Sequence, residues 1–453
     1  MILKTCFLIM MMVLSCAIYA GNPIIPNKGV NDPHIHIFEG RAYLYATHDR
    51  SIENTRFAMD EWGVWSSDDL VNWTLESILK PEDTYIGRPY DQCWATDAAY
   101  RDGKYYFYFS EQNRQTGVVV GDSPIGPWED VLGEPLLPAG LTSTHSYDPA
   151  VYLDDDGEHY IIFGVWDFYI ARLNHDMISL AETPRRIIIH NPRGPYNQDG
   201  TNTEEPTDDK PFVHKYNGKY YLSWGAFYAM SDNLYGPYDY VGTIMNEKSF
   251  APGYAEPTWP YGFLQGRHGS FFEWHNQWYF AYCDISQTGN RRFRDTFISY
   301  VHYKDNGEIA PIRVDGIGVG EYDSRQSVIE AEDYFKAEGF DKVELPGNNF
   351  ALCNSGENAL LIFPNIHHLS EQKSIQLNIA NDQVGGSSLS IFDNSSEGIL
   401  LAVIPIPYTG GINKFITVTH DFEDLKNVED LRFEFGSLKP GSLRFDSFSF
   451  GHE

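Results

Sequence analysis

One hydrophobic pattern occurs five times along the chain: an apolar or alternating run, a short turn, and a second run rich in aromatic residues. The five segments are IHIFEGRAYLYATHD, AAYRDGKYYFYFSE, AVYLDDDGEHYIIFG, FVHKYNGKYYLSWG and SFFEWHNQWYFAYCD. Runs of this kind around a short turn predict β-hairpins. The turns recur at steps of 63, 54, 61 and 58 residues, because they contain Gly40, Gly103, Gly157, Gly218 and Asn276. A regular spacing of this length indicates a repeat architecture.

A second element follows three of the hairpins, namely WSSDDLVNW, VGDSPIGPW and AMSDNLYGPY. We interpret these segments as outer strands closed by a turn. A repeat of about 60 residues made of short alternating strands is typical of a four-stranded propeller blade. Five repeats predict a five-bladed β-propeller over residues 21–323, and the alternative is a large irregular β-sandwich.

The chain changes character from residue 324 onwards. Its strands alternate in SIQLNIAN, SSLSIFD and KFITVTH, which predicts a small β-sandwich of the jelly-roll type over residues 324–453. All ten tryptophans lie at or before Trp278, and Tyr334 and Tyr408 are the only tyrosines of this region. Because it has few aromatic platforms for sugar rings, we expect this module to be mainly structural. The fold class is therefore all-β.

Composition narrows the choice of partners. Lys and Arg total 33 against 63 Asp and Glu, giving a formal net charge of −30. This charge repels nucleic acid and anionic membrane surfaces, so neither is an expected partner. Aromatic residues make up 15 % of the chain. They fill β-cores, but they also stack on the apolar faces of sugar rings, so the composition leaves both roles open.

The N-terminal segment, MILKTCFLIMMMVLSCAIYAGNP, has one lysine followed by an apolar stretch too short to span a bilayer. It predicts a secretory signal peptide over residues 1–20, and hence a periplasmic or extracellular protein with no membrane span. The stretch VLSC also resembles a bacterial lipobox, so lipidation at Cys16 is the alternative. Beyond this segment, the remaining cysteines give neither a disulfide framework nor a metal-ligand spacing; they are Cys93, Cys283 and Cys353.

Acidic residues precede three of the hairpins. They are Asp32 before the first, Asp148 before the third, and Asp208 and Asp209 before the fourth, with Glu204 and Glu205 a little upstream. The innermost strand of each blade runs along the central channel, so acids at its entry converge on one pocket. A single Asp-Pro step is more typical of a turn. Cleavage of a glycosidic bond with inversion uses two carboxyl groups roughly 6.5–9.5 Å apart, one activating water and one donating a proton. A third carboxylate nearby keeps the pKa of the donor raised.

The propeller region resembles glycoside hydrolase family 43, whose five-bladed propellers cleave arabinose and xylose linkages with inversion. The resemblance rests on NPIIPNKGVNDPHIHIFEGRAYLYATHD, WGVWSSDDLVNW, YDPAVYLDDDGEHYIIFG, DDKPFVHKYNGKYYLSWG and GRHGSFFE. The tail, beginning with IEAEDYFKAEGF, resembles a family-6 carbohydrate-binding module.

The resemblance implies catalytic roles for two aspartates. Asp32 matches the general base, and Asp148 matches the aspartate that tunes the pKa of the acid and orients it. Substrate binding is assigned to Trp94, Asp97, His268 and Arg294, with Arg291 and Arg292 as alternatives if the register slips. No cofactor is required and no metal ligand set is visible, although a structural calcium ion near His268 is possible, since His268 matches the channel histidine of the family.

The chain departs from the family at the acid. Relatives carry Glu-Gly-Pro, with the glutamate nine residues before the hairpin glycine, whereas this chain has Asp209-Lys210-Pro211. Asp209 is one methylene shorter, and Lys210 beside it is expected to lower its pKa, which disfavours a general acid at neutral pH. Three hypotheses follow: Asp209 donates the proton, Glu205 donates it from the preceding loop, or activity is weakened or lost.

We therefore expect an exo-acting inverting glycosidase that releases terminal arabinofuranose or xylose from plant polysaccharide fragments, its partners being oligosaccharides or polysaccharides. A pocket at a propeller axis suits a terminal sugar better than a groove does. The alternatives are the same fold acting on another terminal sugar such as galactose, or a glycan-binding protein that has lost its acid.

Overall fold

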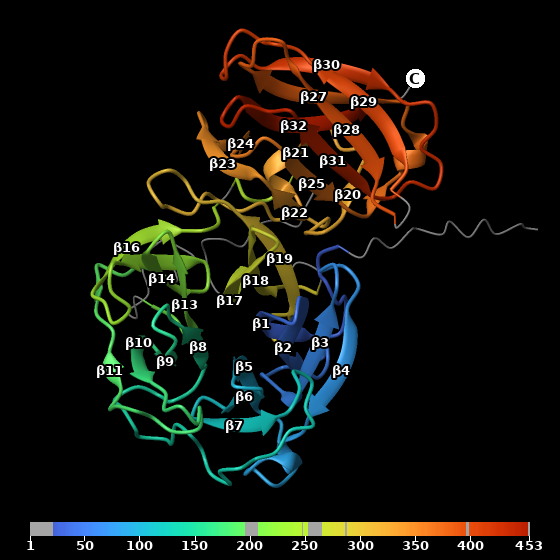
Figure 1. Cartoon of the computed structure of the whole chain (residues 1–453). Coiled ribbons are helices and arrows are strands. Elements are labelled where there is room, and N and C mark those ends of the chain that lie inside the picture. The colour runs from blue at the N-terminus through green and yellow to red at the C-terminus, as the bar shows by residue number, and fades with distance from the viewer. Residues whose placement is uncertain are drawn as a thin grey trace, which may run out of the picture.

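The computed structural model describes residues 21–194, 207–246, 248–251, 265–285, 288–395 and 398–451. It contains a ring of β-sheets with a second β-module beside it (Figure 1). The ring is a five-bladed propeller and the second module is a β-sandwich, so the predicted all-β architecture is confirmed. Among the described residues, no helix is long and apolar enough to cross a membrane.

Each blade is an antiparallel sheet that begins at the ring axis and ends at the rim. Blade one contains β1 (Val30–Phe38), β2 (Arg41–Asp49), β3 (Met59–Ser67) and β4 (Thr74–Leu79), followed by the 3₁₀ turn η1 (Pro81–Asp83). Blade two contains β5 (Cys93–Arg101), β6 (Lys104–Glu111) and β7 (Gln115–Gly121). Blade three contains β8 (Ala150–Leu153), β9 (His159–Val165), β10 (Asp167–Arg172) and β11 (Arg185–Arg186).

Blades four and five complete the ring. Blade four contains β13 (Pro211–Tyr216), β14 (Lys219–Trp224), β15 (Phe227–Ser231) and β16 (Tyr238–Thr243), and the short strand β12 (Ile189–His190) pairs in parallel with β16. Blade five contains β17 (Gln265–Trp274), β18 (Gln277–Asp284) and β19 (Asp295–Val301). The inner strands β1, β5, β8, β13 and β17 face one another across the axis (Figure 1).

Blades one and three have the expected four strands, and blade four adds β12 to its own four, whereas the described sheets of blades two and five have three. In blade two, two isolated bridges, Val120 with Glu129 and Thr116 with Leu137, stand where an outer strand was expected. Pro127 lies in that segment and has no N–H to donate. In blade five, the chain start fills the outer position: Ile24 N donates to Thr296 O, and Asn22 bonds both main-chain groups of Ile298. The first residues of the propeller thus close the ring against its last blade.

The hairpin turns follow the predicted chemistry. In four of the five, both central residues have positive φ, as a two-residue type I′ turn requires. The pairs are Glu39-Gly40, Asp102-Gly103, Asn217-Gly218 and His275-Asn276. This turn twists in the same sense as the flanking strands, so the register is regular next to each turn; in blades one, two and five it shifts only at the far end of the hairpin, where the inner strand begins.

Most aromatic residues fill the cores of the blades. Trp62 and Trp224, for example, are fully buried, and aromatic side chains dominate the cluster that joins blades three, four and five. The aromatic composition is therefore explained mainly by packing rather than by a sugar-binding surface.

The C-terminal module packs two sheets face to face around one apolar core. One sheet has the order β23 (Phe340–Leu345), β24 (Asn349–Asn354), β32 (Leu443–Gly451), β27 (Ser374–Asn381) and β30 (Ile416–Asp421), with β21 (Ile329–Glu330) also paired to β32. The other has the order β22 (Lys336–Glu338), β25 (Ala359–Phe363), β31 (Leu431–Gly436), β28 (Ser387–Asp393) and β29 (Leu400–Ile406). The predicted strands SIQLNIAN and SSLSIFD are β27 and β28.

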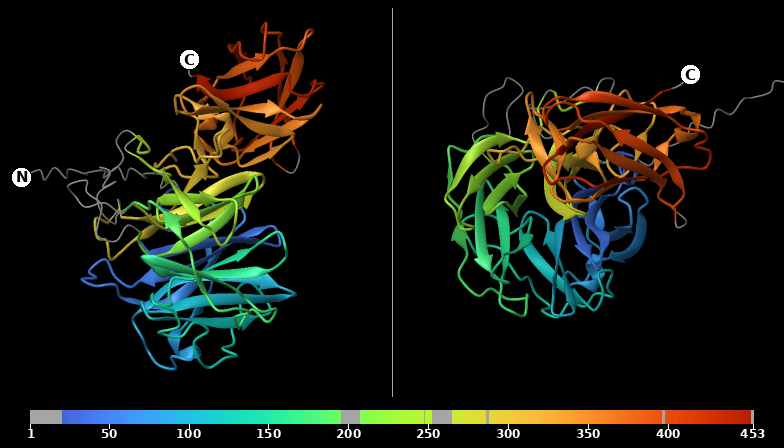
Figure 2. Two further views of the ribbon diagram at one scale, coloured as in Figure 1. Left: turned by 90° about the vertical axis from the view of Figure 1, so that its left-hand side faces the viewer. Right: turned by 45° about the horizontal axis from the view of Figure 1, so that its top comes forward.

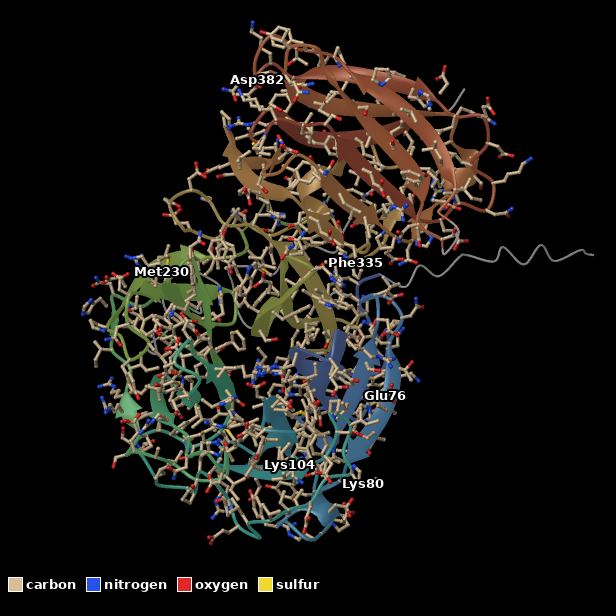
Figure 3. The ribbon with its side chains drawn as sticks, viewed as in Figure 1. Glu76, Lys80, Lys104, Met230, Phe335 and Asp382 are labelled. Atoms are coloured by element: carbon tan, nitrogen blue, oxygen red, sulfur yellow. The ribbon has the colours of Figure 1, made fainter. Side chains whose placement is uncertain are left out.

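Four short elements lie outside these sheets: the paired strands β20 (Tyr322–Asp323) and β26 (Ile366–His367), and the 3₁₀ turns η2 (Ala331–Asp333) and η3 (Leu369–Glu371). The sandwich lies against blade five in both views of Figure 2. Gln277 of β18 donates to Glu332 O at 2.8 Å and to Tyr334 O at 3.0 Å. Phe335, labelled at the junction in Figure 3, contacts the ring of Trp274 edge-on at 5.5 Å. These contacts hold the two modules together.

Candidate active site

The inner strands enter the channel through a repeated backbone kink. One residue at the start of four inner strands has a left-handed φ of 52–58°; these residues are Asp32, Asp148, Lys210 and His268. Each is followed by a proline or a glycine. A left-handed conformation is unfavourable for a residue with a side chain, and such strain collects at functional sites. The kink thus marks the same point of each blade, at one end of the channel.

A cavity of about 240 Å³ lies at this end of the channel. Its lining includes six of the eight residues expected at the site, namely Asp32, Asp148, Asp209, Trp94, His268 and Arg294. Residues separated by up to 262 positions in the sequence therefore meet in one place. Glu205 lies outside the described residues, and Asp97 lies outside the lining.

Asp32 is buried and held by a cation. Arg294 Nη1 lies 2.7 Å from Asp32 Oδ1, and His268 Nδ1 lies 3.2 Å from the same oxygen. The thiol of Cys283 also donates to this oxygen, at 3.4 Å. Burial raises the pKa of Asp32, but Arg294 and His268 outweigh burial, so the pKa lies below its ordinary value. Asp32 is therefore ionised at neutral pH.

Asp148 has the opposite environment. Both of its carboxyl oxygens are buried, and neither has a hydrogen-bond partner among the described residues. Burial and the neighbouring carboxylate of Asp209 raise the pKa of Asp148 to about 7, against the opposing effect of His268 and Lys210. Two adjacent carboxyl groups share a proton more readily than both ionise. The Asp148–Asp209 pair therefore carries a proton at neutral pH.

His268 lies between the two kinds of carboxyl group. Its Nδ1 faces Asp32, and its Nε2 lies 3.2 Å from Asp209 Oδ1. One imidazole ring thus separates Asp32 from Asp209. Burial lowers the pKa of His268, but Asp32 and Asp209 outweigh burial and raise it. The arrangement sets an ionised carboxylate on one side of the ring and a proton-bearing pair on the other.

Arg294 lines the cavity, but its donors are used within the protein. Its Nε lies 3.0 Å and its Nη2 3.1 Å from the Asp49 carboxylate, in addition to the contact with Asp32. Its guanidinium also lies over the Phe57 ring, 5.1 Å from the ring centre. The main task of Arg294 is therefore to hold Asp32, rather than to bind sugar alone. The alternatives Arg291 and Arg292 do not line the cavity.

The expected role of Asp97 in substrate binding is not supported. Asp97 is fully buried. One oxygen accepts from His36 at 2.6 Å and from Ala98 N at 2.7 Å, and the other accepts from Val151 N at 2.5 Å. These bonds join blades one, two and three, and they leave the carboxylate no face toward the cavity. Sequence position alone could not separate this supporting role from a binding one.

Sequence reasoning missed part of the cavity wall. Phe57, His145, Tyr147 and Trp166 also line the cavity. Trp166 joins β9 to β10, has a left-handed φ of 62°, and is 48 % exposed. A tryptophan in the turn between two strands is unusual, and this position could have pointed to Trp166 from the sequence. Trp94 lines the same cavity, and its buried Nε1 has no hydrogen-bond partner among the described residues.

Two groups of side chains are close enough to share a cation: Asp148, Asp209 and His268, and separately His34, His36 and Asp97. Calcium prefers six to eight oxygen ligands. The first group offers two carboxyls and one ring nitrogen, beside the ammonium of Lys210. In the second group, the ring nitrogens contact the Asp97 carboxylate directly as hydrogen-bonding partners. Neither described donor set fits a calcium ion.

The fold and the paired carboxyl groups define a glycoside hydrolase. Residues 20–309 match the model of glycosyl hydrolases family 43, and residues 330–452 match that of carbohydrate binding module family 6. The first match covers more than half of the chain, which therefore belongs to glycosyl hydrolases family 43 and is a glycosidase.

Named relatives agree with this assignment. The chain is 30 % identical to a xylosidase/arabinosidase of Bacteroides ovatus over 337 residues, covering 64 % of this chain and 96 % of the relative. It is 25 % identical to an arabinoxylan arabinofuranohydrolase of Paenibacillus polymyxa over 494 residues, covering 95 % and 74 %. The structure of a family-43 enzyme from Xanthomonas citri with xylotriose superposes with a TM-score of 0.51 at 27 % identity, covering 66 % of this chain and 94 % of that one.

Proposed function

We propose that this protein is an exo-acting, inverting glycoside hydrolase that releases terminal arabinofuranose or xylose from fragments of plant polysaccharide. The observation that carries the proposal is the cavity with an ionised Asp32 on one side of His268 and the proton-bearing Asp148–Asp209 pair on the other. Inversion uses one carboxylate to activate water and one carboxylic acid to protonate the leaving oxygen. The names of the relatives support the two sugars.

Asp32 is the general base in this proposal, and Asp209 is the general acid. Asp148 supplies the like charge that keeps a proton on the pair. The aromatic wall of Trp94, Phe57 and Trp166 faces the sugar ring, because flat apolar surfaces stack on the C–H faces of sugars. The small cavity at the channel end suits one terminal residue of a chain.

The test is hydrolysis of aryl arabinofuranoside and aryl xyloside, with proton NMR of the first product formed. We expect release of the aryl group and a product of inverted anomeric configuration. Asp32→Asn should lose about 10³-fold in kcat, as expected for removal of a general base, while Asp382→Asn at the far end of the sandwich (Figure 3) serves as the control. A retained anomer would exclude the mechanism. Absence of hydrolysis with retained oligosaccharide binding would establish the non-catalytic alternative.

We also propose that the site works without bound calcium, since its positive charge comes from Arg294, His268 and Lys210. The described donors do not supply the oxygen shell that calcium prefers. Dialysis against EDTA should leave kcat and Tm within error of the untreated enzyme, and added calcium should change neither. A loss of activity on chelation that calcium restores would contradict this proposal.

A further inference from the structure

Lys210 is a lysine with no exposed surface, at the mouth of the channel. Lysine is among the residues least often fully buried, because removing an ammonium from water is costly unless it is paired. Its backbone also has a left-handed φ of 58°. A residue that is both strained and buried in charged form needs a compensating role.

The ammonium of Lys210 joins three blades. Lys210 directly precedes β13 of blade four, and its Nζ donates to Thr96 O at 2.9 Å and to Pro149 O at 3.0 Å. Thr96 belongs to β5 of blade two, and Pro149 directly precedes β8 of blade three. The Pro149 carbonyl is one residue from Asp148, so the bond fixes the kink that presents the Asp148 carboxyl.

The charges around Lys210 come from every neighbouring inner strand. The carboxyl groups of Asp148, Asp97, Asp32 and Asp209 act on it, in that order of strength. The imidazole of His34 in β1 also faces it. The guanidinium of Arg294 is already paired with the carboxylates of Asp32 and Asp49. Two cationic groups favour the ionised form of Asp148: first the imidazole of His268 in β17, and then the ammonium of Lys210. The expected charge interaction of Lys210 with Asp209 is present, but those with Asp148, Asp97 and Asp32 are stronger.

We propose that Lys210 is a positioning residue whose ammonium acts as a built-in cation beside Arg294 and His268: it ties the Asp148-Pro149 kink to blade two and helps three carboxyl groups share one cavity. This inference rests on the proposed function above. It also explains the departure from the Glu-Gly-Pro pattern, because Lys210 stands at the glycine position of that pattern and supplies a positive charge there.

The test compares Lys210→Met with the wild type. Methionine keeps most of the length and the same backbone strain but has no charge and no N–H donors. Removing one close positive charge makes carboxyl groups harder to ionise. We expect both limbs of the kcat/KM profile against pH to move upward by about 1 unit, and kcat at the optimum to fall by about 10- to 100-fold through loss of positioning.

Lys342→Met is the matched control. Lys342 is a partly buried lysine at the junction between the modules, where its Nζ contacts Gln277 and lies 2.9 Å from His302 Nδ1. Its loss should lower Tm and leave the pH profile in place. If Lys210→Met does not fold, the same measurements are made on Lys210→Gly, because glycine adopts this left-handed φ without strain. A folded Lys210 variant whose two limbs coincide with those of the wild type overturns the inference.

A second readout does not depend on activity. Because Asp148 keeps a proton in the folded state that it loses in the unfolded state, stability falls as pH rises through its folded pKa of about 7. Without Lys210 the folded pKa of Asp148 is higher, so stability continues to fall to higher pH. The Tm of Lys210→Met should therefore lie further below that of the wild type at pH 8.5 than at pH 5.5. An equal deficit at both pH values would show a merely structural lysine. An inactive wild type would refute the proposed function and leave this readout intact.

Discussion

At the scale of single residues, the site holds chemically identical side chains in different protonation states. Asp32 contacts Arg294 and His268, which favour its anion. Asp148 has no hydrogen-bond partner among the described residues and faces Asp209, which favours its protonated form. The difference lies entirely in the neighbours, because burial acts on both carboxyl groups in the same direction.

These environments predict a bell-shaped dependence of kcat/KM on pH. Activity should rise with pH as Asp32 ionises, and it should fall above about pH 7 as the Asp148–Asp209 pair loses its proton. Asp148→Asn removes the like charge, so the acid then ionises more easily and the alkaline limb should move to lower pH. A pH profile of the wild type and this variant checks the prediction. An unmoved alkaline limb would mean that Asp148 does not act on the acid.

The identity of the acid gives a second prediction at this scale. A good leaving group needs little protonation, so loss of the true acid should harm a dinitrophenyl glycoside far less than a natural disaccharide. We expect Asp209→Asn to lose at least about 10²-fold more on the disaccharide than on the activated substrate. Glu205→Gln is the comparison variant. If that variant alone shows the selective loss, Glu205 is the acid.

At the scale of elements, the cavity is built from the ends of strands rather than from their middles. The kinked entries of β1, β8, β13 and β17 turn Asp32, Asp148, Lys210 and His268 toward the axis. The turn between β9 and β10 adds Trp166 from the side of blade three. The hairpins therefore hold the charged groups of the site in place, while the turn between β9 and β10 adds the aromatic side chain of Trp166.

Trp166 should act in binding rather than in chemistry. An aromatic contact of this kind contributes about 1 kcal/mol, so Trp166→Ala should raise KM by roughly fivefold to tenfold with kcat nearly unchanged. Tyr100→Ala is a matched control, since Tyr100 is 45 % exposed on β5 and is not part of the cavity lining. Steady-state kinetics on an aryl glycoside measure both. A fall in kcat with constant KM would place Trp166 in the transition state instead.

At the scale of the whole molecule, the sandwich lies against the outside of blade five (Figure 2). Arg313 Nη1 lies 2.7 Å and His302 Nε2 3.0 Å from the carboxylate of Asp333 in η2. Next to this polar network, Phe335 covers Trp274 and His275 of blade five. The module thus shields apolar surface of the propeller, in keeping with a structural role.

Loss of that shield should destabilise the propeller. Phe335→Ala uncovers the Trp274 ring, which at 6 % exposure is nearly buried, and should cost about 1–2 kcal/mol of the free energy of unfolding. Denaturant unfolding followed by tryptophan fluorescence measures it, with the highly exposed Val384→Ala as control. An unchanged midpoint for Phe335→Ala would show that the two modules are thermodynamically independent.

The sequence by itself determined the repeats, the hairpin turns and the family. Hairpin turns depend on the residues at two positions, and strand alternation depends on a period of two, so both can be read locally. Five regular repeats then predicted a ring, and in a ring the inner strands bring Asp32, Asp148 and Asp209 together. The residues 1–20 lie outside the described part of the chain, so the signal peptide and the alternative lipidation at Cys16 stay predictions.

Only the tertiary structure decided what each converging side chain does. Asp97 and Arg294 looked like sugar ligands, but neighbours from other blades occupy their polar atoms. Lys210 stands next to Asp209 in sequence, but its left-handed backbone sends the ammonium to carbonyl groups of blades two and three. Hydrogen bonds and charge–charge interactions depend on distances of a few ångströms between strands far apart in the chain. That information exists only once the ring has closed.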